Sequence, residues 1–483
     1  MSQIPKFGLD RFLHRGSDQR HRLVKLAGAW TVVVIVAVAV GVAANGSGRL
    51  ALALGGGLLV FGIYVADPIL LAVLVLPGSL LLQRVGGSST NLSVADLMVF
   101  IGGAVCLFHI RWREAVFLRQ FFRGIVWYQA VLIMVVVANP NRYDIVEWCH
   151  RLSYLGASVL VGWVVATNNR TSQAIRMFLW GSSILAVVAM EHAVTAHFLP
   201  AQWGVYQKNS IGAVLWVAVV VAQLRPQWVG LGKGEARICE FLCIGGLLAS
   251  QSRQAAISLI LAIAVATLLN PEVRRQSKLI LLGCIPLIVA LYYSFSLAAR
   301  NNPKFNSVSI RLGQFSDAIH VWRQSPVLGE GMHFFSLPQY ISVTTPPNVL
   351  IDNLASTGVV GSLAFFYLVF MTMRTMSRLP RAVGTLGLAI LLGHYVDGLF
   401  DIFWIGASMI PPFVIAGMSL GMADAEGRSR AASSGRKVPT VVGRGSPWAP
   451  SGRAIDHAIG RARTALVAPF RAVLGTSPAP EPR

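Results

Sequence analysis

The sequence predicts an all-α fold: a polytopic membrane helix bundle of about 12–14 transmembrane helices with one long extracytoplasmic loop. Composition is the first indication, since 54% of the 483 residues are hydrophobic and only 13% are charged, whereas soluble domains carry roughly 25% charged residues. The mean hydropathy is +0.61. Apolar stretches of about 16 to 22 residues recur along the chain, and each can cross roughly 30 Å of hydrocarbon as a helix.

The apolar stretches give the expected helices in chain order. The first follows a basic N-terminus and is too long for the core of a signal peptide, so we expect a retained anchor. The second and third are separated only by Asp67-Pro68. The expected segments are Val24–Ala44, Leu50–Ala66, Pro68–Leu82, Ala95–Ile110, Gly124–Ala138, Cys149–Thr167, Met177–Thr195, Ser210–Gln223, Ile238–Ser250, Gln254–Asn270, Leu279–Ala298, Val349–Met373, Ala382–Phe400 and Trp404–Met422.

The positive charge is distributed as in a membrane protein. A net charge of +21 would suggest a nucleic-acid partner for a soluble chain, but here Lys and Arg gather in the N-terminus, in alternate loops and in the C-terminal tail. This pattern follows the positive-inside rule, so both termini are predicted to be cytoplasmic and no nucleic-acid partner is expected. The basic residues of the predicted inner loops are Arg111, Arg113, Arg119, Arg123, Arg170, Arg176, Arg225, Lys233, Arg237, Arg274, Arg275, Lys278, Arg374, Arg378 and Arg381.

This topology divides the chain into five regions. They are a cytoplasmic basic N-terminus (1–23), a transmembrane bundle (24–298), a long extracytoplasmic loop (299–348), C-terminal transmembrane helices (349–422) and a cytoplasmic basic tail (423–483). The tail is rich in Gly, Ser, Pro and Arg and is predicted to be disordered. Within it, Ile455 to Leu474 fits a basic amphipathic helix on the inner leaflet or a solvated segment equally well.

The long loop is itself a functional signal, because connections of about fifty residues are uncommon between packed helices. A helix is expected from Ser309 to Gln324, and its one apolar stripe would let it lie flat on the membrane or cap the bundle. The stripe consists of Leu312, Phe315, Ile319 and Trp322, with Arg311 at its edge and Asp317 and His320 on other faces.

The cysteines predict neither disulfides nor a metal site. All five lie in or at the ends of apolar segments and none lies in the long loop, so a disulfide framework is not indicated. Cys239 and Cys243 share a helix face, where packing is favoured over metal binding. No metal and no cofactor are expected.

Basic residues on the predicted outer face are exceptions to the positive-inside rule, so each calls for a structural or functional explanation. Arg253 stands out because the turn Ser250-Gln251-Ser252-Arg253 joins two apolar helices and holds a guanidinium at the level of the outer headgroups. This place suits a bidentate grip on phosphate, and it equally suits an arginine that reaches towards lipid phosphates. The outer basic residues are Arg84, Arg142, Lys208, Arg253, Arg300, Lys304, Arg311 and Arg323.

Three ionisable residues lie within the thirteenth segment or at its outer end. His394, Asp397 and Asp401 recur at i, i+3 and i+7 and therefore share one helix face. Intramembrane ionisable groups are functional candidates. This face can form part of a polar cavity, a proton relay or a helix–helix contact, of which the contact is favoured.

Four elements in order resemble the O-antigen ligase and O-antigen polymerase superfamily of bacterial membrane glycosyltransferases. Gln207-Lys208-Asn209-Ser210 is similar to the Lys-Asn element of the family, and Ser252-Arg253 to its Ser-Arg turn. The third element is similar to the family's Arg…Trp…Pro-x-x-Gly-x-Gly run and consists of Arg311, Trp322, Pro326, Gly329 and Gly331. The fourth is similar to the end of the family's His-Asn-x9-Gly-x-x-Gly signature and consists of Asn348 and Gly358-Val-Val-Gly361. Each element alone is weak, but their order around the long loop is fairly specific.

The sequence departs from the family at one position, since Pro347 stands where the signature histidine is expected. In the ligases that histidine is thought to act on the acceptor hydroxyl. Either another residue serves as the base, or this branch works differently, or it lacks transferase activity. The catalytic candidates are His333, ranked first, then His320 and Asp317, with Glu330 and Asp352 as further carboxylates.

The resemblance implies transfer of a glycan from a polyprenyl-pyrophosphate carrier, such as undecaprenyl pyrophosphate, to an extracytoplasmic acceptor in cell-envelope polysaccharide biosynthesis. It places the chain in the bacterial cytoplasmic membrane as a metal-independent enzyme whose partners are the lipid-linked donor, a glycan or glycolipid acceptor and the bilayer. The implied substrate-binding residues are Arg253 and Arg311 for the pyrophosphate, with Lys208 and Asn348. The alternative is a transporter or flippase of lipid-linked glycans, which would use the His394 face for coupling.

Overall fold

The computed structural model describes residues 48–83, 92–197, 199–269, 307–340, 343–401 and 406–433. A number of the predictions fall on other residues and lie outside this description. They are the basic N-terminus, the segments Val24–Ala44 and Leu279–Ala298, Arg84, Arg274, Arg275, Lys278, Cys284, Arg300, Lys304 and the tail beyond Ser433, with Ile455 to Leu474. Up to Ser433 the predicted tail is helical.

The chain separates into two compact units, Met1–Leu71 and Ala72–Arg483. Helix α2 (Gly48–Ala66) ends just before Asp67, and α3 (Pro68–Gly78) begins just after it. The side chain of Asp67 accepts a hydrogen bond from the Ile69 N–H at 3.1 Å, which caps the new helix. Proline is well suited to a first helical position because its missing N–H would have no helical partner there. The predicted break at Asp67-Pro68 is therefore real.

The second unit is helical throughout its described part, and no strand is found there. Among the described residues, five spans are long and apolar enough to cross a membrane by length and composition: Val116–Ala138, Arg142–Thr167, Thr171–Thr195, Val349–Ser377 and Ala407–Arg430. The predicted all-α membrane fold is thus confirmed. The helices are α4 (Val94–His109), α5 (Val116–Ala138), α6 (Arg142–Leu152), α7 (Ser158–Thr167), α8 (Thr171–Thr195), α9 (Lys208–Leu224), α10 (Lys233–Ser250), α11 (Arg253–Leu269), α13 (Ser307–Gln324), α14 (Val349–Ser377), α15 (Arg381–Asp397) and α16 (Ile410–Ser433).

Small residues set the closest helix contact, between α7 and α16. A Cβ atom at Gly417 would lie 2.3 Å from the Val159 carbonyl oxygen, and one at Gly162 would lie 1.9 Å from the Val414 carbonyl oxygen. Gly417 and Gly421 form a Gly-x-x-x-Gly pair that lets the two backbones touch, the usual means of tight helix association within lipid.

Helix α6 begins earlier than the apolar pattern suggests. The predicted segment starts at Cys149, whereas the helix starts at Arg142 and runs through a π-helical turn (Ser153–Ala157) into α7. Asn141 caps its first turn by accepting the Asp144 N–H at 2.9 Å. The extra turns carry polar residues that are nevertheless buried, and hydropathy alone reads such residues as loop. This difference matters because those turns form one side of the site.

Helix α14 is broken at Gly358, whose φ of 64° and ψ of −166° are not helical. The loop before it fills the break: Glu330 and Gly331 donate to the Ala355 and Ser356 carbonyls at 3.1 Å, while Val359 donates to the Pro326 carbonyl at 3.0 Å. A Cβ atom at Gly358 would lie 2.2 Å from the Val327 carbonyl oxygen. The two Gly motifs of the resemblance are therefore the two halves of one backbone joint, which we call the loop joint (Pro326–Gly331 with Ala355–Val360).

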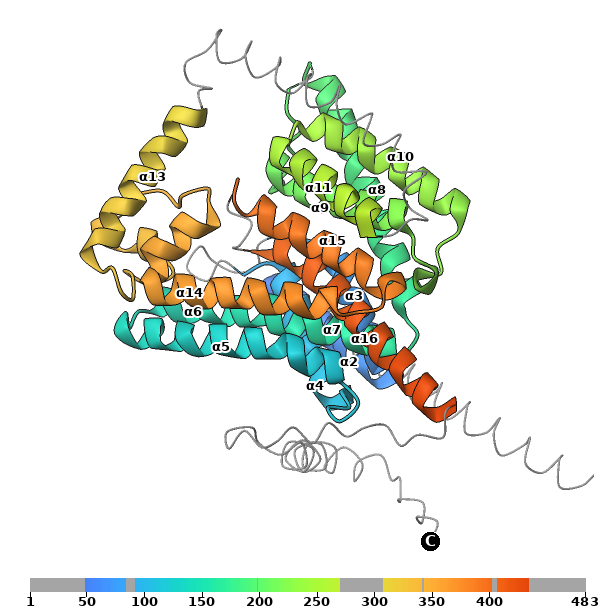
Figure 1. Ribbon diagram of the computed structural model, residues 1–483. Helices are drawn as coiled ribbons and strands as arrows, with labels where there is room; N and C mark the ends of the chain where they lie inside the picture. The colour runs from blue at the N-terminus through green and yellow to red at the C-terminus, as the bar shows by residue number, and fades with distance from the viewer. Residues whose placement is uncertain are drawn as a thin grey trace, which may run out of the picture. The chain divides into compact units, whose positions relative to one another are not determined.

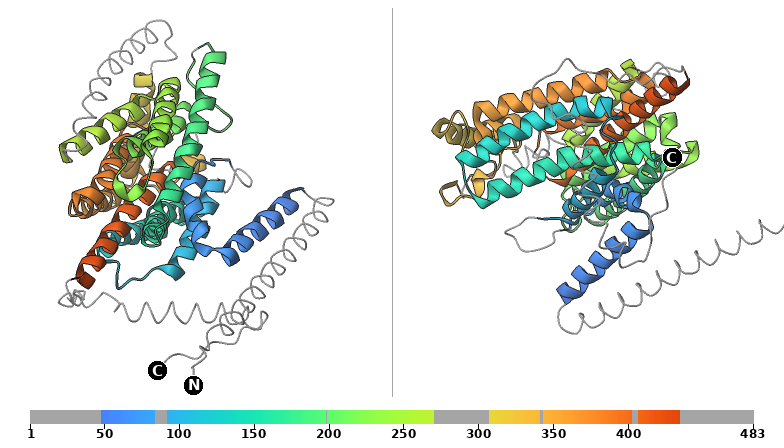
Figure 2. Two further views of the ribbon diagram at one scale, coloured as in Figure 1. Left: turned by 90° about the vertical axis from the view of Figure 1, so that its right-hand side faces the viewer. Right: turned by 90° about the horizontal axis from the view of Figure 1, so that it is seen from below.

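The loop joint lies beside the long helices of the unit. Helices α5 and α14 run side by side (Figures 1 and 2) and pack along their length, and α13 packs against α14. The packed face of α13 is Ala318 and Val321, which join Phe334, Tyr340 and Ala355 in a buried apolar cluster. The predicted helix of the loop is present, but Leu312 of its expected stripe is 61% exposed.

Candidate functional site

A polar cavity of about 570 Å³ opens among α4, α6, the start of α9 and the segment after α15. We call it the mixed-charge cavity, because carboxylate, imidazole and hydroxyl groups line it together with backbone and amide groups. Its lining residues are Ser79, Leu82, Ser93, Asp96, Glu147, His150, Tyr154, Gly204, Val205, Gln207, Asn209, Ser210, Val214, Asp401, Gly406, Ala407 and Ser408.

Asp96, in the first turn of α4, lies in one wall of the cavity. Ser93 and Asp96 form a capping box, in which each side chain accepts a hydrogen bond from the other residue's backbone. This reciprocal arrangement satisfies donors that a helix start otherwise leaves unpaired. The Tyr154 hydroxyl donates to the second oxygen of Asp96. Both oxygens of Asp96 are thus occupied, so this carboxylate has a positioning role in the wall.

Glu147 and His150 reach the same cavity from α6. The Glu147 Oε1 atom accepts a hydrogen bond from the Arg151 Nε at 3.0 Å, and its Oε2 atom lies 3.9 Å from the His150 Nδ1. The His150 ring stacks on Tyr154 with centroids 5.6 Å apart. One oxygen of Glu147 is therefore fixed by an arginine, while among the described residues the partner of its other oxygen is the neighbouring imidazole.

Arg151 is completely buried between α5, α6 and α14. It donates to the Tyr128 hydroxyl at 3.1 Å and to the Asn353 side-chain oxygen at 3.4 Å. A second carboxylate, Asp352, has its Oδ2 atom 3.8 Å from the Arg151 NH2 group. A buried charge needs such partners because removal from water is costly. Arg151 thus ties α6 to the first turn of α14 and fixes the orientation of Glu147.

The opposite wall is organised around Asp401. Its Oδ2 atom accepts hydrogen bonds from the Asn209 amide of α9 and, at 2.7 Å, from the Gln254 amide of α11. A Cβ atom at Gly212 would lie 2.4 Å from the Ser252 Cβ, so glycine lets the Ser-Arg turn approach α9 closely. This contact brings the turn that carries Arg253 close to α9, whose first residues Asn209 and Ser210 line the cavity.

Three of the four predicted substrate-binding residues come together near Asp401, although they are not among the residues that line the cavity. Lys208 of α9 interacts electrostatically with Arg253 of α11, Arg311 of α13 and Asp401, and Arg253 interacts with Arg311. Helices far apart in the sequence therefore gather three cations beside one carboxylate. Three like charges gathered in this way repel one another, so a bound anion would relieve their repulsion.

The fourth predicted binding residue, Asn348, caps α14. Its side-chain oxygen accepts the Leu350 and Ile351 N–H groups at 2.9 and 3.1 Å, and its amide donates to the Leu399 carbonyl at 2.8 Å. All these partners are backbone groups. Contact of Asn348 with substrate stays a prediction.

His333 is half-buried next to the Arg151 network but is not among the cavity-lining residues. Its backbone N–H donates to the Asp144 Oδ1 atom at 2.9 Å, and its ring lies between Tyr143 and Phe335, at centroid distances of 5.9 and 4.2 Å. Burial lowers the pKa of His333 below its ordinary value, and the charge of Glu147 opposes this shift in part. The imidazole is therefore neutral at pH 7 and available to accept a proton.

The other catalytic candidates lie elsewhere. Asp317 and His320 are exposed on α13, away from the packed face at Ala318 and Val321. Pro347 is buried immediately before the Asn348 cap. The catalytic roles of Asp317 and His320 stay predictions.

The three residues of the His394 face lie in different surroundings. Asp397 is buried and accepts the Trp216 indole N–H at 3.2 Å across the contact of α15 with α9, and His394 is also buried. Of the three, Asp401 is the one that lines the cavity. The face therefore combines two of the three alternatives, a helix–helix contact at Asp397 and a polar cavity at Asp401.

A signal for Glu147 and Arg151 was present in the sequence, but the predicted boundary at Cys149 hid it. If the helix starts at Arg142, then Asp144, Glu147 and Arg151 recur on one face of a membrane span, and intramembrane ionisable residues are functional candidates. Asp96 carried a weaker signal, the Ser-x-x-Asp pattern of a capping box.

Comparison with protein families supports the resemblance. Residues 239–366 match the family described as O-antigen ligase. A search of curated proteins found no match. The matched region begins in α10 and ends in α14, so it contains Arg253, Arg311, the loop joint and Asn348. The region from α10 to α14 is therefore similar to the O-antigen ligase family, and it is set in a helical membrane fold.

Proposed function

We propose that this chain transfers a glycan from a polyprenyl-pyrophosphate carrier to an acceptor hydroxyl on the extracytoplasmic side of the bacterial cytoplasmic membrane. The observation that carries the proposal is the convergence of Lys208, Arg253 and Arg311 beside the mixed-charge cavity. A pyrophosphate carries several negative charges at pH 7 and suits such a cluster, since guanidinium groups bind phosphate oxygens in pairs.

The proposed reaction needs two opposite kinds of group. The acceptor oxygen attacks the anomeric carbon of the glycan, the bond from that carbon to the phosphate oxygen breaks, and the bonding electrons leave with the polyprenyl pyrophosphate. Arg253, Arg311 and Lys208 stabilise the charge that grows on the leaving group. A general base takes the proton of the acceptor hydroxyl. The sugar–phosphate bond is already activated, so the scheme requires no metal.

Glu147 is the base that we propose in place of the missing histidine. Arg151 fixes one of its oxygens, and the other faces the cavity near His150. Asp96 is less suited, because hydrogen bonds occupy both of its oxygens. His333 remains the second candidate, since it lies in the same charged environment and is neutral.

The polyprenyl chain also has a place to bind. An apolar depression of about 390 Å³ adjoins the mixed-charge cavity: Leu80 and Leu81 line the depression, whereas Ser79 and Leu82 line the cavity. Tyr206 stands between them, with its hydroxyl donating to the Leu80 carbonyl. A lipid tail in the depression would bring its pyrophosphate to the cations.

The test is glycan transfer by the purified chain in lipid vesicles supplied with polyprenyl-pyrophosphate-linked glycan and acceptor. Arg253→Gln and Arg311→Gln should each lower turnover by roughly a hundredfold, in line with the loss of one stabilising group. Arg323→Gln is the matched control, because Arg323 is an exposed basic residue of the same α13 helix. Normal turnover in both cavity variants would refute the proposal. Movement of the donor across the bilayer without transfer would identify a flippase.

A further inference from the structure

A second cavity, of about 870 Å³, lies at the opposite ends of the helices that frame the first. Helix α9 starts at Lys208 beside the mixed-charge cavity, and its last residues, Ala222 to Leu224, line the second. Seventeen helical residues span about 25 Å. Helix α15 connects the two places in the opposite direction, from Arg381 to the segment before Asp401. The two sites are therefore separate.

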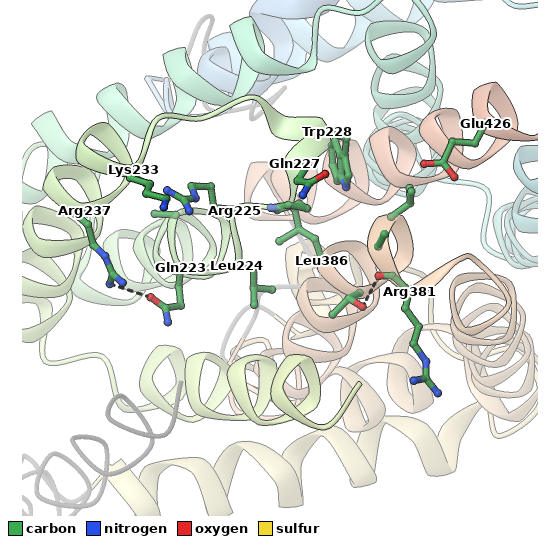
Figure 3. A pocket seen from close by; sticks show the side chains of 16 residues that line it. Gln223, Leu224, Arg225, Gln227, Trp228, Lys233, Arg237, Arg381, Leu386 and Glu426 are labelled. Atoms are coloured by element: carbon green, nitrogen blue, oxygen red, sulfur yellow. Dashed lines mark hydrogen bonds between the residues drawn. The ribbon is translucent and has the colours of Figure 1, made fainter. Parts of the chain in front are cut away.

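We call this the cationic cavity, because most of its charged lining residues are basic (Figure 3). Lys233, Arg225 and Arg237 occupy one side of it, and Arg381 and Glu426 the other. Apolar residues also line it, among them Leu224, Val383 and Leu386.

Two of these charges are already neutralised within the protein. Arg237 pairs with Glu240 at 2.9 Å, and Glu426 pairs with Arg430 at 3.4 Å. Three cations are left, Arg225, Lys233 and Arg381. Within the parts of the chain that the structure describes, none of these three side chains has a hydrogen-bond acceptor or an acidic partner. The cavity thus carries a surplus of positive charge.

The backbone holds one of these cations in place. Arg225 ends α9 in the left-handed region, with φ 34° and ψ 60°, a conformation uncommon for residues other than glycine. Pro226 follows and fixes the exit of the chain. The Trp228 indole N–H, on the same wall, is buried without a hydrogen-bond partner among the described residues. A donor and a positioned guanidinium therefore line one side of the cavity.

We propose that the cationic cavity binds a phosphate group, with an anionic phospholipid headgroup as its source. The three surplus cations match the charge of phosphate, and the apolar residues Val383, Leu386 and Leu224 offer a surface for the first carbons of acyl chains. Basic pockets between membrane helices on the cytoplasmic side bind such headgroups, and the positive-inside prediction puts these helix ends on that side. A bound headgroup bridges the α9–α10 turn and the start of α15.

The experiment measures ligand binding and thermal unfolding of the full chain in detergent, and it needs no glycan substrate. Cardiolipin or phosphatidylglycerol should raise the Tm by several degrees, whereas phosphatidylcholine should not. Inorganic phosphate and pyrophosphate form a separate arm. A rise with these soluble anions and none with lipid would assign the site to a free phosphate instead of a headgroup.

The cavity is tested by the double variant Lys233→Gln/Arg381→Gln. Loss of two cations should weaken anionic-lipid binding by roughly twenty-five-fold, since each is worth roughly a fivefold factor near an anionic surface. The matched control is Arg374→Gln/Arg378→Gln, which removes two exposed basic residues at the end of α14 that do not line the cavity. Lys233→Gln alone, at an exposed helix start, serves if the double variant does not fold. Equal lipid responses in cavity and control variants, or no response in the wild type, would overturn the proposal.

Discussion

The two ends of α9 differ in how their charges are arranged. At Lys208 the cations lie near carboxylates: Asp401 interacts with Lys208, and Asp401 lines the mixed-charge cavity together with Glu147. At Arg225 three cations share a cavity in which the acidic lining residue is already paired. A reaction that moves a proton and expels an anion needs both a base and cations, whereas retention of a phosphate needs cations alone. The difference separates a site suited to chemistry from a site suited to binding.

The largest expected effect is the loss of transfer in Glu147→Gln, which would leave the cationic cavity intact. The amide keeps a hydrogen-bond acceptor for Arg151 but cannot take a proton from the acceptor. Turnover should fall by roughly 10² to 10⁴, the usual range for a general base, while anionic-lipid binding is unchanged. Transfer and lipid titration on the same preparation measure both. Retained turnover in this variant, together with its loss in His333→Ala, would move the role of base to His333.

The next largest expected effect is a loss of stability in Arg151→Met. It removes the only cation that the structure places between Glu147 and Asp352 among the described residues, and leaves two buried carboxylates uncompensated. Breaking a buried pair in this way costs about 3–5 kcal/mol. Thermal unfolding in detergent is the measurement. The triple variant Glu147→Gln/Arg151→Met/Asp352→Asn should recover much of the Tm but no turnover, and failure to recover it would show that Arg151 acts through packing.

Gly358→Ala tests whether the loop joint holds the loop against α14. Alanine at φ 64° is strained, and its Cβ atom would meet the Val327 carbonyl. Left-handed strain alone costs about 1–3 kcal/mol. We expect a lower Tm and faster proteolysis of the loop near Val327. Gly313→Ala is the matched control, because a Cβ atom at Gly313 of α13 would have no neighbour within 4 Å. Similar proteolysis of both variants would argue against the joint.

The smallest expected effect is a pH dependence of stability at His333. Burial depresses the pKa of this residue in the folded protein below the ordinary value of 6.5, so the unfolded chain binds a proton first as the pH falls. The contribution of neutral His333 is complete above pH 6.5 and is lost as the pH falls from there towards the folded pKa. Tm measured against pH should decline less below 6.5 in His333→Gln than in the wild type. Identical profiles would show that this imidazole is not the titrating group.

The apolar pattern predicts most of the fold because lipid leaves few choices for a chain with such long apolar runs. The helix break at Asp67-Pro68 and the loop helix near Ser309 were both visible in sequence. The start of α6 was not, because Glu147 and Arg151 lower the hydropathy of a segment that the fold buries. Their burial depends on partners from α5 and α14, such as Tyr128 and Asp352, which no local pattern reveals.

The sequence predicted single residues of the site but not how they come together, because that depends on tertiary contacts. Lys208, Arg253 and Arg311 could be singled out because each is a cation on the predicted outer face, where cations are uncommon. Their convergence depends on the approach of α11 to α9 at Gly212, which is a tertiary contact. The glycines of the loop motifs suggested a family, but sequence could not show that Gly329 and Gly358 belong to one joint.

The loop joint has a practical consequence for building chimeric proteins. Its hydrogen bonds run from backbone to backbone, so they do not depend on which side chains stand at Val327, Leu328 or Glu330. A segment from Ser325 to Gly361 that is exchanged between related proteins would contain both halves of the loop joint. Such a transplant could alter the surface offered to an acceptor without a new design for the surrounding helices.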